Sequence, residues 1–368
     1  MKKTTFLMIA FLTLATVTAN AKVWRVSNRA NEDQDFSTLQ DAINGASAGD
    51  TLYVAGSPFS YGSGTFTKRL TVIGTGYWLN ENDTTQAYKE KSWVQQLVFN
   101  VGSKGSVISG LYVYYGNYGS QQNWKLISIN TDSIVIQRNF IYGFASENST
   151  YTGFSIYVDG NKSGIIIQQN WIIAQLADYY GNSANGTVYG IYFSGVPTEC
   201  IVQNNFVRSY LSHNYGTCYS IALNNNALND LKVAGNVIWG TISTYYTNHF
   251  NNILVSGSYN YGIGDEPFNN LGSSTQYPAG NGNQQNVNMD SVFVDYDLYI
   301  DKGYLLKPNS PAKNAGIDGG DCGAFGNDFG CKPCVLSGIP AIPAIFEVNT
   351  QMYGEETIPV NIKAKSNN

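Results

Sequence analysis

The sequence predicts an all-β fold, a single parallel β-helix, and two repeats with a shared period support this prediction. The first repeat is a block of mostly β-branched residues around one asparagine. It is too short and too β-branched for a helix, so we expect a strand, a one-residue corner and a second strand. Self-similarity at this period is typical of solenoids, in which each repeat buries its apolar face against its neighbours. The four asparagines are 31, 35 and 31 residues apart, at Asn139, Asn170, Asn205 and Asn236.

The second repeat is a five-residue apolar pattern that lies about ten residues before three of the blocks, at 154–158, 189–193 and 219–223. Each coil therefore contains at least two strands, and we expect three. Strands stacked in this way, with turns between them, form a parallel β-helix. Alternation along the strands predicts that Ile134, Ile136 and Ile141 point inward, whereas Val135 and Gln137 point outward.

The repeated asparagines are predicted to be structural. Asparagine tolerates the left-handed conformation that a corner requires, and its amide can bond the asparagine of the next coil. An outer ladder of glutamines is expected beside them, at Gln137, Gln168 and Gln203.

Residues 1–21 have the features of a secretory signal peptide. Lys2 and Lys3 precede an apolar run that is too short to span a membrane, and a small-x-small site ends at Ala21. No later segment approaches the length of a membrane span. We therefore expect export and cleavage after Ala21.

The mature chain is expected to form one β-helix over residues 22–334, closed at its start by a helix. Residues 36–45 place Phe36, Leu39, Ala42 and Ile43 on one helical face, which can cover the open end of the first coil. Residues 335–368 form a Pro-containing C-terminal extension in which 358–364 predict one further strand.

Residues 36–43, residues 48–54 and the asparagine repeats resemble the pectate-lyase-like family of secreted right-handed parallel β-helix proteins. Residues 305–326 are similar to the end of the β-helix in bacterial cell-envelope members. The resemblance implies a right-handed coil and a bacterial protein that is secreted or held at the cell surface. It specifies activity poorly, because this fold hosts lyases, hydrolases and surface proteins without activity.

The composition argues against nucleic acid and against acidic membranes as partners. Only 13% of the residues are charged and the formal net charge is −5, whereas such partners require a concentrated basic surface.

A polysaccharide lyase would need a cation or metal to neutralise a uronate, together with a base and an acid. The outward basic candidates are Arg138, Arg208 and Lys232, and calcium would be a cofactor only under this hypothesis. These residues do not share one position of the coil, so solvated surface charges are the favoured interpretation. The acidic candidates for calcium are Asp132, Asp159 and Asp178.

Hydrolase and histidine chemistry have little support in the sequence. A glycosidase needs two opposed carboxylates, and the repeat core lacks a pair; Asp295 and Asp297 are weak candidates late in the chain. His213 and His249 are the only histidines, and we expect both to lie in loops and to be solvated.

Aromatic side chains are the abundant functional groups. Tyr157 and Tyr192 fall at one outward position of adjacent coils, where rings could stack on sugars while amides bond hydroxyl groups. For Phe140, Trp171 and Phe206 we favour ordinary packing between strands. Further candidate ligand-binding tyrosines lie in loops or next to them, at Tyr179, Tyr180, Tyr210 and Tyr215.

The cysteines predict an oxidising compartment only in part. A disulfide is expected among Cys322, Cys331 and Cys334, and Cys200 aligns with inward positions and is expected to be a buried free thiol. No resident metal or other cofactor is expected.

Taken together, these features favour an exported, non-catalytic protein that presents a Tyr/Asn-rich face to a polysaccharide or cell-surface glycan. Two alternatives stay open, namely a polysaccharide lyase or related glycan-cleaving enzyme, and a surface scaffold or adhesin that binds another protein. The C-terminal extension is a candidate contact for an envelope protein.

Overall fold

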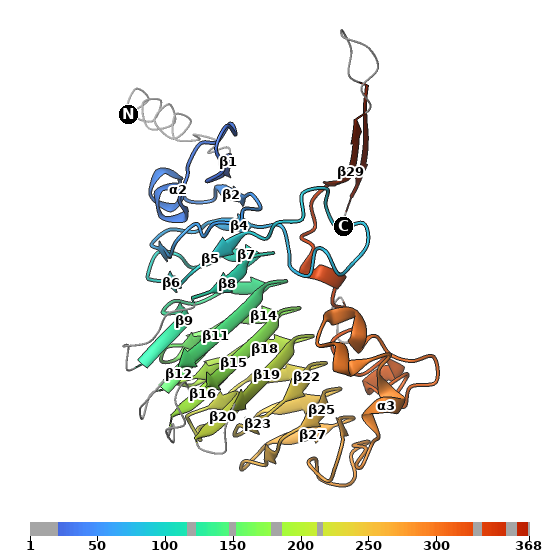
Figure 1. Ribbon diagram of the computed structural model, residues 1–368. Coiled ribbons are helices and arrows are strands. Elements are labelled where there is room, and N and C mark those ends of the chain that lie inside the picture. Colours follow the sequence, from blue (N-terminus) through green and yellow to red (C-terminus); the bar gives the residue numbers. More distant parts are fainter. Residues whose placement is uncertain are drawn as a thin grey trace, which may run out of the picture.

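The protein is a right-handed parallel β-helix whose strands form three long parallel sheets (Figure 1). The computed structural model describes residues 21–115, 123–146, 152–177, 186–211, 216–326, 333–350 and 359–366. Each coil passes through sheet A, then sheet C, then sheet B, before it returns to sheet A. The coils stack along one axis from the N-terminal helix downward in Figure 1.

The strands are named here by sheet. Sheet A contains β1 (Val23–Val26), β2 (Thr51–Val54), β4 (Thr71–Ile73), β7 (Val107–Ser109), β10 (Val135–Gln137), β14 (Ile166–Gln168), β18 (Cys200–Gln203), β21 (Leu231–Ala234), β24 (Asn248–Phe250) and β27 (Glu266–Phe268). Sheet B contains β3 (Gly64–Phe66), β6 (Leu97–Phe99), β9 (Asn123–Ile129), β12 (Thr152–Val158), β16 (Thr187–Phe193), β20 (Thr217–Leu223), β23 (Thr241–Ser243) and β26 (Tyr259–Asn260). Sheet C contains β5 (Trp93–Val94), β8 (Tyr112–Tyr114), β11 (Phe140–Ser146), β15 (Trp171–Ala177), β19 (Phe206–Leu211), β22 (Val237–Trp239), β25 (Ile253–Ser256) and β28 (Leu271–Gly272). A small parallel pair, β13 (Lys162–Ser163) and β17 (Pro197–Thr198), joins two turns.

The interior of the coils is aliphatic, as the alternation predicts. Ile134, Ile136 and Ile141 are fully buried, whereas Val135 and Gln137 lie on the partly exposed outer face of sheet A. The expected glutamine ladder is present on that face: Gln168 donates to Gln137 over 2.9 Å, and Gln203 donates to Gln168 over 2.8 Å.

An asparagine ladder runs inside the corner between sheets A and C. The Nδ2 of Asn139 donates to the Oδ1 of Asn170 over 3.1 Å and to the carbonyl of Ile108 over 3.2 Å, and each later member repeats this pattern. The amides of Asn139, Asn170, Asn205 and Asn236 are buried and paired, so they satisfy the polar groups of the turn. The ladder continues beyond the four predicted residues through Asn252, Asn270 and Asn283.

The left-handed residue of the corner is not the ladder asparagine, contrary to expectation. It is the residue before it, with φ of 55° at Arg138, 57° at Gln169 and 51° at Asn204. The corner needs one left-handed residue whose side chain points outward, and the following side chain then turns inward. The inward position is the one that requires an amide.

The N-terminal end is closed by α2 (Leu39–Gly45), which buries Leu39, Ala42 and Ile43 over the first coils. The helix starts at Leu39 because the Thr38 hydroxyl caps it, accepting from the backbone N–H of Asp41 over 3.2 Å. Phe36 therefore precedes the helix and packs against Trp24, with ring centroids 5.3 Å apart.

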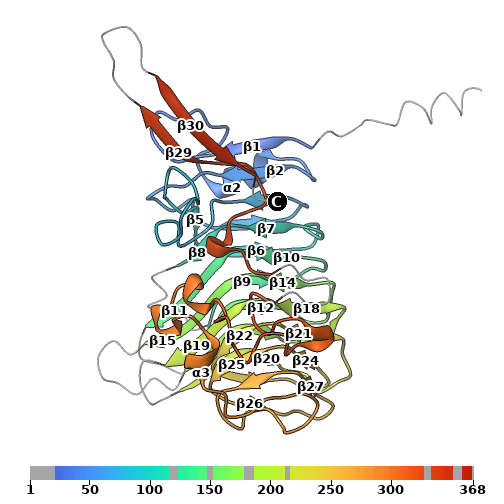
Figure 2. The same ribbon diagram turned by 90° about the vertical axis from the view of Figure 1, so that its right-hand side faces the viewer.

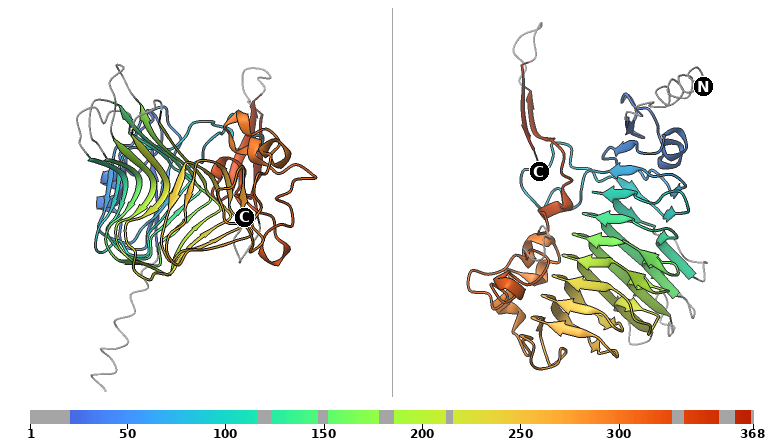
Figure 3. Two further views of the ribbon diagram at one scale, coloured as in Figure 1. Left: turned by 90° about the horizontal axis from the view of Figure 1, so that it is seen from below. Right: turned by 180° about the vertical axis from the view of Figure 1, so that it is seen from behind.

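The coils end earlier than the predicted limit at residue 334. Their last strands are β27 and β28, and the following chain folds back over the outer face of sheet C (Figure 3). The sheet C column that we expected to be packing is buried, with Phe140, Trp171 and Phe206 at 4%, 3% and 1% exposure. Tyr304 of this layer packs against Trp171 and Phe206, whereas Tyr77 and Trp78 pack against Phe140. The short helices of the layer are α3 (Met289–Val292), η1 (Tyr296–Leu298), η2 (Asp301–Tyr304), η3 (Ile317–Gly319) and η4 (Leu336–Gly338).

The last part of this layer, here called the corner strap (residues 315–326 and 333–339), is held by the side chains of the left-handed corner residues. It runs antiparallel to the progression of the coils, so later coils hold its earlier residues. The contacts are Asn269 Nδ2 to the carbonyl of Ala315 (2.8 Å), Asn204 Nδ2 to Ala324 (3.1 Å), Gln169 Nε2 to Pro333 (2.6 Å) and Arg138 Nη1 to Ile339 (3.0 Å).

The C-terminal extension forms an antiparallel hairpin rather than a single strand. Its strands, β29 (Ala344–Thr350) and β30 (Val360–Lys365), pair with each other apart from the three long sheets (Figure 2). No helix in the described residues is both long and apolar enough to cross a membrane.

Candidate functional site: an aromatic stack that ends over Ala222

Two columns of aromatic rings lie on the outer face of sheet B. In the first, Phe154, Tyr189 and Tyr219 are register partners whose stacked rings are 5.0 and 5.1 Å apart. In the second, the rings of Tyr157 and Tyr192 stack at 5.6 Å. Parallel strands in register bring equivalent outward residues to one strand spacing, so the repeated pattern in the sequence produces these columns directly.

The stack leaves Tyr157 without a free ring face. The Nζ of Lys125 lies 3.4 Å from the Tyr157 ring centroid on one side, and Tyr192 stacks on the other. The Tyr157 hydroxyl also donates to Asp159 over 3.1 Å. The expectation that Tyr157 and Tyr192 offer an equal pair of stacking faces is therefore replaced by an asymmetric arrangement.

The second column stops at Tyr192. Its register partner on the next strand is Ala222, which is followed by Ser243, so neither partner covers its second face with another ring. A pocket of about 290 Å³ lies at this step and is called here the Ala222 pocket. Tyrosine rings, amides and hydroxyls line it, including those of Tyr192, Tyr219, Asn224, Asn225, Ser243 and Tyr245.

The pocket offers uncharged hydrogen-bonding groups. Burial, together with the neighbouring tyrosines, raises the pKa of Tyr192 to about 12, and burial raises the pKa of Tyr189 as well. Both phenols therefore stay protonated at neutral pH, able to donate and to accept. In the described part of the chain, the residues lining the pocket include no Asp, Glu, Lys, Arg or His. This arrangement suits a neutral, hydroxyl-rich ring better than an ion.

Tyr210, another predicted ligand residue, lies on a different face. It belongs to β19 of sheet C, where its hydroxyl and that of Tyr142 donate to the Oε1 of Gln175 over 2.6 and 2.5 Å. Other residues singled out from the sequence lie outside the described part of the chain: Tyr179, Tyr180, Tyr215, Asp178 and His213.

The three basic residues considered for a lyase do not come together. Arg138 is buried at a corner, where it donates to Gln169 over 3.0 Å and to Ile339 of the corner strap, and this role is structural. Burial lowers the pKa of its guanidinium. Arg208 lies on the outer face of sheet C, and Lys232 is exposed on sheet A.

The acidic residues considered for calcium are engaged elsewhere. Asp132 accepts from the backbone N–H of Ser163 over 3.0 Å, and Asp159 pairs with the Tyr157 hydroxyl. Within the described ranges, no three or more His, Cys, Asp or Glu side chains form a group that could hold a metal ion.

The sequence predicted that His249 is a solvated loop residue, and this prediction is wrong. His249 is fully buried on β24, inside the coil. Its Nε2 lies 2.8 Å from the Thr244 hydroxyl, which in turn donates to Asp265 over 2.9 Å. Burial lowers the pKa of His249 to about 3 and raises that of Asp265. A single histidine among aliphatic positions gave no sequence signal for this internal network.

The cysteines show no bond between Cys322 and Cys334. The Cys322 thiol donates to the carbonyl of Asn269 over 3.3 Å, and the Cys334 thiol donates to that of Asn204 over 2.8 Å. Cys331 lies outside the described residues, so a pairing that includes it stays a prediction. Cys200 is a buried free thiol, as expected.

The step at Ala222 was missed in the sequence analysis, although a signal for it is present. The second repeat has tyrosine at its fourth position in 154–158 and 189–193 but alanine in 219–223. The loss of one ring at this repeat position marks the opening.

No known family model matches the sequence, and no curated protein matches it. Solved structures with a similar fold include the pectin methylesterase from Aspergillus niger, at 17% identity, a TM-score of 0.33, and coverage of 67% of this chain and 87% of that one. Pectate lyase Pel9A matches at 11% identity and a TM-score of 0.35, over 83% of this chain and 96% of that one. DFA-IIIase from Arthrobacter chlorophenolicus A6, without its lid, matches at 12% identity and a TM-score of 0.25, over 72% and 99%.

These carbohydrate-active enzymes share the β-helix class of fold with this chain. The low identities and TM-scores carry no inference about activity. The fold class follows from the three ladders of parallel strands in the structure itself.

Proposed function

We propose that this is an exported, non-catalytic protein that binds a neutral glycan in the Ala222 pocket. The observation that carries this proposal is the end of the aromatic column: Tyr192 stacks on Tyr157, and its next register partner, Ala222, brings no ring and lines a pocket together with Tyr192. A sugar ring placed over Ala222 would extend the column by one member.

The other groups of the pocket support a sugar rather than an apolar ligand. Asn224 and Asn225 offer amides, and Ser243 and Tyr245 offer hydroxyls, around the same opening. Such groups bond hydroxyls from several directions, whereas an apolar ligand would leave them unpaired at a cost of about 1–3 kcal/mol each.

Two observations favour binding over cleavage. The described residues that line the Ala222 pocket include no carboxylate, histidine or cation, and the three basic candidates lie at a buried corner, on sheet C and on sheet A. Export rests on the signal-peptide pattern of residues 1–21, and we place the protein at the surface of a bacterium or outside it. The hairpin β29–β30 is a candidate contact for an envelope protein.

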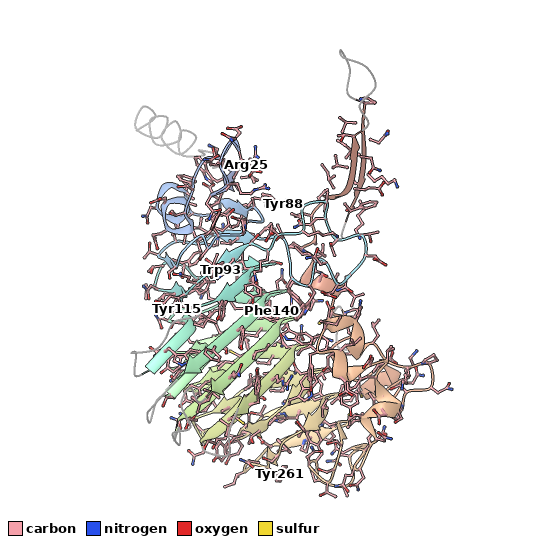
Figure 4. All side chains as sticks on the ribbon, in the orientation of Figure 1. Arg25, Tyr88, Trp93, Tyr115, Phe140 and Tyr261 are labelled. Carbon is pink, nitrogen blue, oxygen red and sulfur yellow. The ribbon has the colours of Figure 1, made fainter. Side chains whose placement is uncertain are left out.

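The test is affinity gel electrophoresis of the purified mature protein against xylan, glucomannan, β-glucan and galactan. We expect retardation by at least one of these polymers. Tyr192→Ala should weaken it about tenfold, since one aromatic contact contributes on the order of 1 kcal/mol. Tyr88→Ala is the matched control, because Tyr88 is 44% exposed and lies near the N-terminal end of the solenoid, away from the pocket (Figure 4).

Equal retardation of the parent and Tyr192→Ala, with both folded, would remove the Ala222 pocket as the site. Retardation by none of the four polymers would remove this binding proposal. Release of unsaturated uronates or of reducing ends by the parent would contradict the non-catalytic part and support the lyase alternative.

A further inference from the structure

Arg208, on the outer face of sheet C, is held between two tyrosine rings. Its guanidinium carbon lies 4.7 Å from the ring centroid of Tyr210 on the same strand and 4.3 Å from that of Tyr299 in the C-terminal layer. Tyr299 takes a left-handed backbone conformation, with φ of 50°, directly after η1. A bulky residue adopts this conformation at a cost, so the surrounding structure fixes Tyr299 in its place over Arg208.

The guanidinium has no oxygen acceptor among the described residues. Neither a hydrogen bond nor an ion pair within 4.0 Å joins Arg208 to any of them. By contrast, Arg138 donates hydrogen bonds from its Nε to Gln169 and from its Nη1 to Ile339. Asp290 and Asp297 lie close enough to raise the pKa of Tyr296, but neither pairs with Arg208. Contacts with two rings use the faces of the guanidinium and leave its in-plane N–H donors available.

This cation borders a pocket of about 490 Å³ between sheet C and the C-terminal layer. Among the described residues that line this pocket, Arg208 is the single charged one. Aromatic and polar groups lie beside it, at Trp239, Ser256, Ser273, Asn288, Tyr296 and Tyr299, and the apolar side chains of Val255, Val287 and Met289 complete the wall. A fixed cation in an otherwise uncharged pocket favours one negative charge, and the adjacent rings favour a flat or cyclic body.

We propose that this Arg208 pocket is a second ligand site, which binds one oxyanion, a carboxylate or a sulfate, carried on a sugar or aromatic ring. The guanidinium takes the oxyanion in a forked pair of hydrogen bonds, and Trp239 and Tyr296 pack against the ring. Tyr210 and Tyr299 act as positioning residues that orient Arg208. The site lies on sheet C and does not depend on the Ala222 pocket of sheet B.

The test is a titration of the mature protein with glucuronate, glucose 6-sulfate, benzoate and uncharged glucose, followed by calorimetry and by Trp fluorescence. At least one anionic probe should bind, and glucose should bind at least tenfold more weakly. Added salt should lower the affinity for the anionic probe. The three anions distinguish a carboxylated sugar, a sulfated sugar and an aromatic acid as the source of the oxyanion.

Arg208→Gln should lower the affinity for the anion about tenfold or more, since a charged hydrogen-bond pair is lost. Lys232→Gln, which removes an exposed cation on sheet A, is the matched control and should leave binding unchanged. Tyr299→Leu should lower the affinity for the anion. Arg208→Lys keeps a positive charge, so its anion binding should retain part of the salt dependence that Arg208→Gln loses. Binding of glucose as tight as glucuronate, full affinity in Arg208→Gln, or no binding of any anion would overturn the proposal. Because the Tyr192→Ala variant leaves sheet C intact, failure at one pocket is distinguishable from failure at the other.

Discussion

Tyr192 of β16 and Ala222 of β20 are register partners on adjacent strands, and the aromatic column that starts at Tyr157 ends between them. The opening beside Tyr192 is therefore defined by one small residue in a position where the preceding two coils carry tyrosine. The predicted glycan site depends on this step more than on the number of aromatic rings.

Filling the step should close the site. Ala222→Tyr should add a third ring to the column, occupy the space beside Tyr192 and abolish retardation by the glycan. Ala222→Ser, which keeps the side chain small, should bind like the parent. Affinity electrophoresis checks both variants, with thermal unfolding as a control for folding. Undiminished binding by Ala222→Tyr would show that the ligand lies elsewhere.

The asparagine ladder should contribute strongly to stability. Asn170→Leu removes the acceptor of the Asn139 N–H and Nδ2 groups and the donor to the carbonyl of Ile136. Each buried group left unpaired should lower the free energy of unfolding by about 1–3 kcal/mol. Urea unfolding measures this loss.

The matched variant for the ladder is Gln168→Leu, at the partly exposed end of β14, two residues before Asn170. Its amide bonds can be replaced by water, so the expected loss is about 0.5 kcal/mol or less. Equal stability of Asn170→Leu and Gln168→Leu would contradict the structural role of the inner ladder.

Stability should fall as the pH drops from about 6.5, the unfolded pKa of histidine, toward 3. Burial lowers the pKa of His249 to about 3, so within this window the unfolded chain binds a proton that the folded chain does not. His249 should contribute a slope of up to about 1.4 kcal/mol per pH unit there. Asp265 acts in the opposite sense, because burial raises its pKa and its stabilising effect is lost as the pH rises.

Comparison of the parent with His249→Gln isolates the histidine, because both proteins keep Asp265. The glutamine amide can still donate to Thr244. Urea unfolding at several pH values should show a shallower pH dependence for the variant between pH 6.5 and 3. Identical slopes would mean that His249 is already protonated in the folded protein or stays accessible to water.

Export should yield a mature chain that begins at Lys22. The backbone nitrogen of Lys22 donates to Asp50 over 2.9 Å, and the Trp24 indole donates to the same carboxylate over 2.7 Å. These and other hydrogen bonds hold the pKa of Asp50 below its usual range. Cleavage would place the new α-ammonium beside this carboxylate. N-terminal sequencing of the exported protein checks the site, and a first residue inside the β-helix would contradict it.

Much of the solenoid was predictable because its residues repeat. The inward positions of Ile134, Ile136 and Ile141, the outer glutamines and the N-terminal helix follow from local periodicity, although the helix begins at Leu39 rather than at residue 36. Periodicity could not predict what covers the outside of sheet C. The predicted β-helix limit at residue 334 includes Val292 and Phe293 among the coils, whereas both residues belong to the second layer.

The site was predicted less completely for a related reason. Tyr157 and Tyr192 were identified from equivalent positions, but which of their faces is free depends on Lys125 and Ala222, which lie on neighbouring coils. The hidden role of Arg138 likewise depends on Ile339, two hundred and one residues later in the chain. Contacts of this kind between distant segments leave no local pattern.

The corner strap also changes how the molecule should come apart. A solenoid whose coils touch only their neighbours can fray from an exposed end, one coil at a time. Here the side chains of Asn269 and Asn204 donate hydrogen bonds to the first part of the corner strap, and those of Gln169 and Arg138 donate to its last part. Unfolding of the last coil therefore also disturbs the corner strap, which is hydrogen-bonded to coils in the middle of the stack. The coils from Arg138 onward should open as one cooperative unit and exchange their amide protons together.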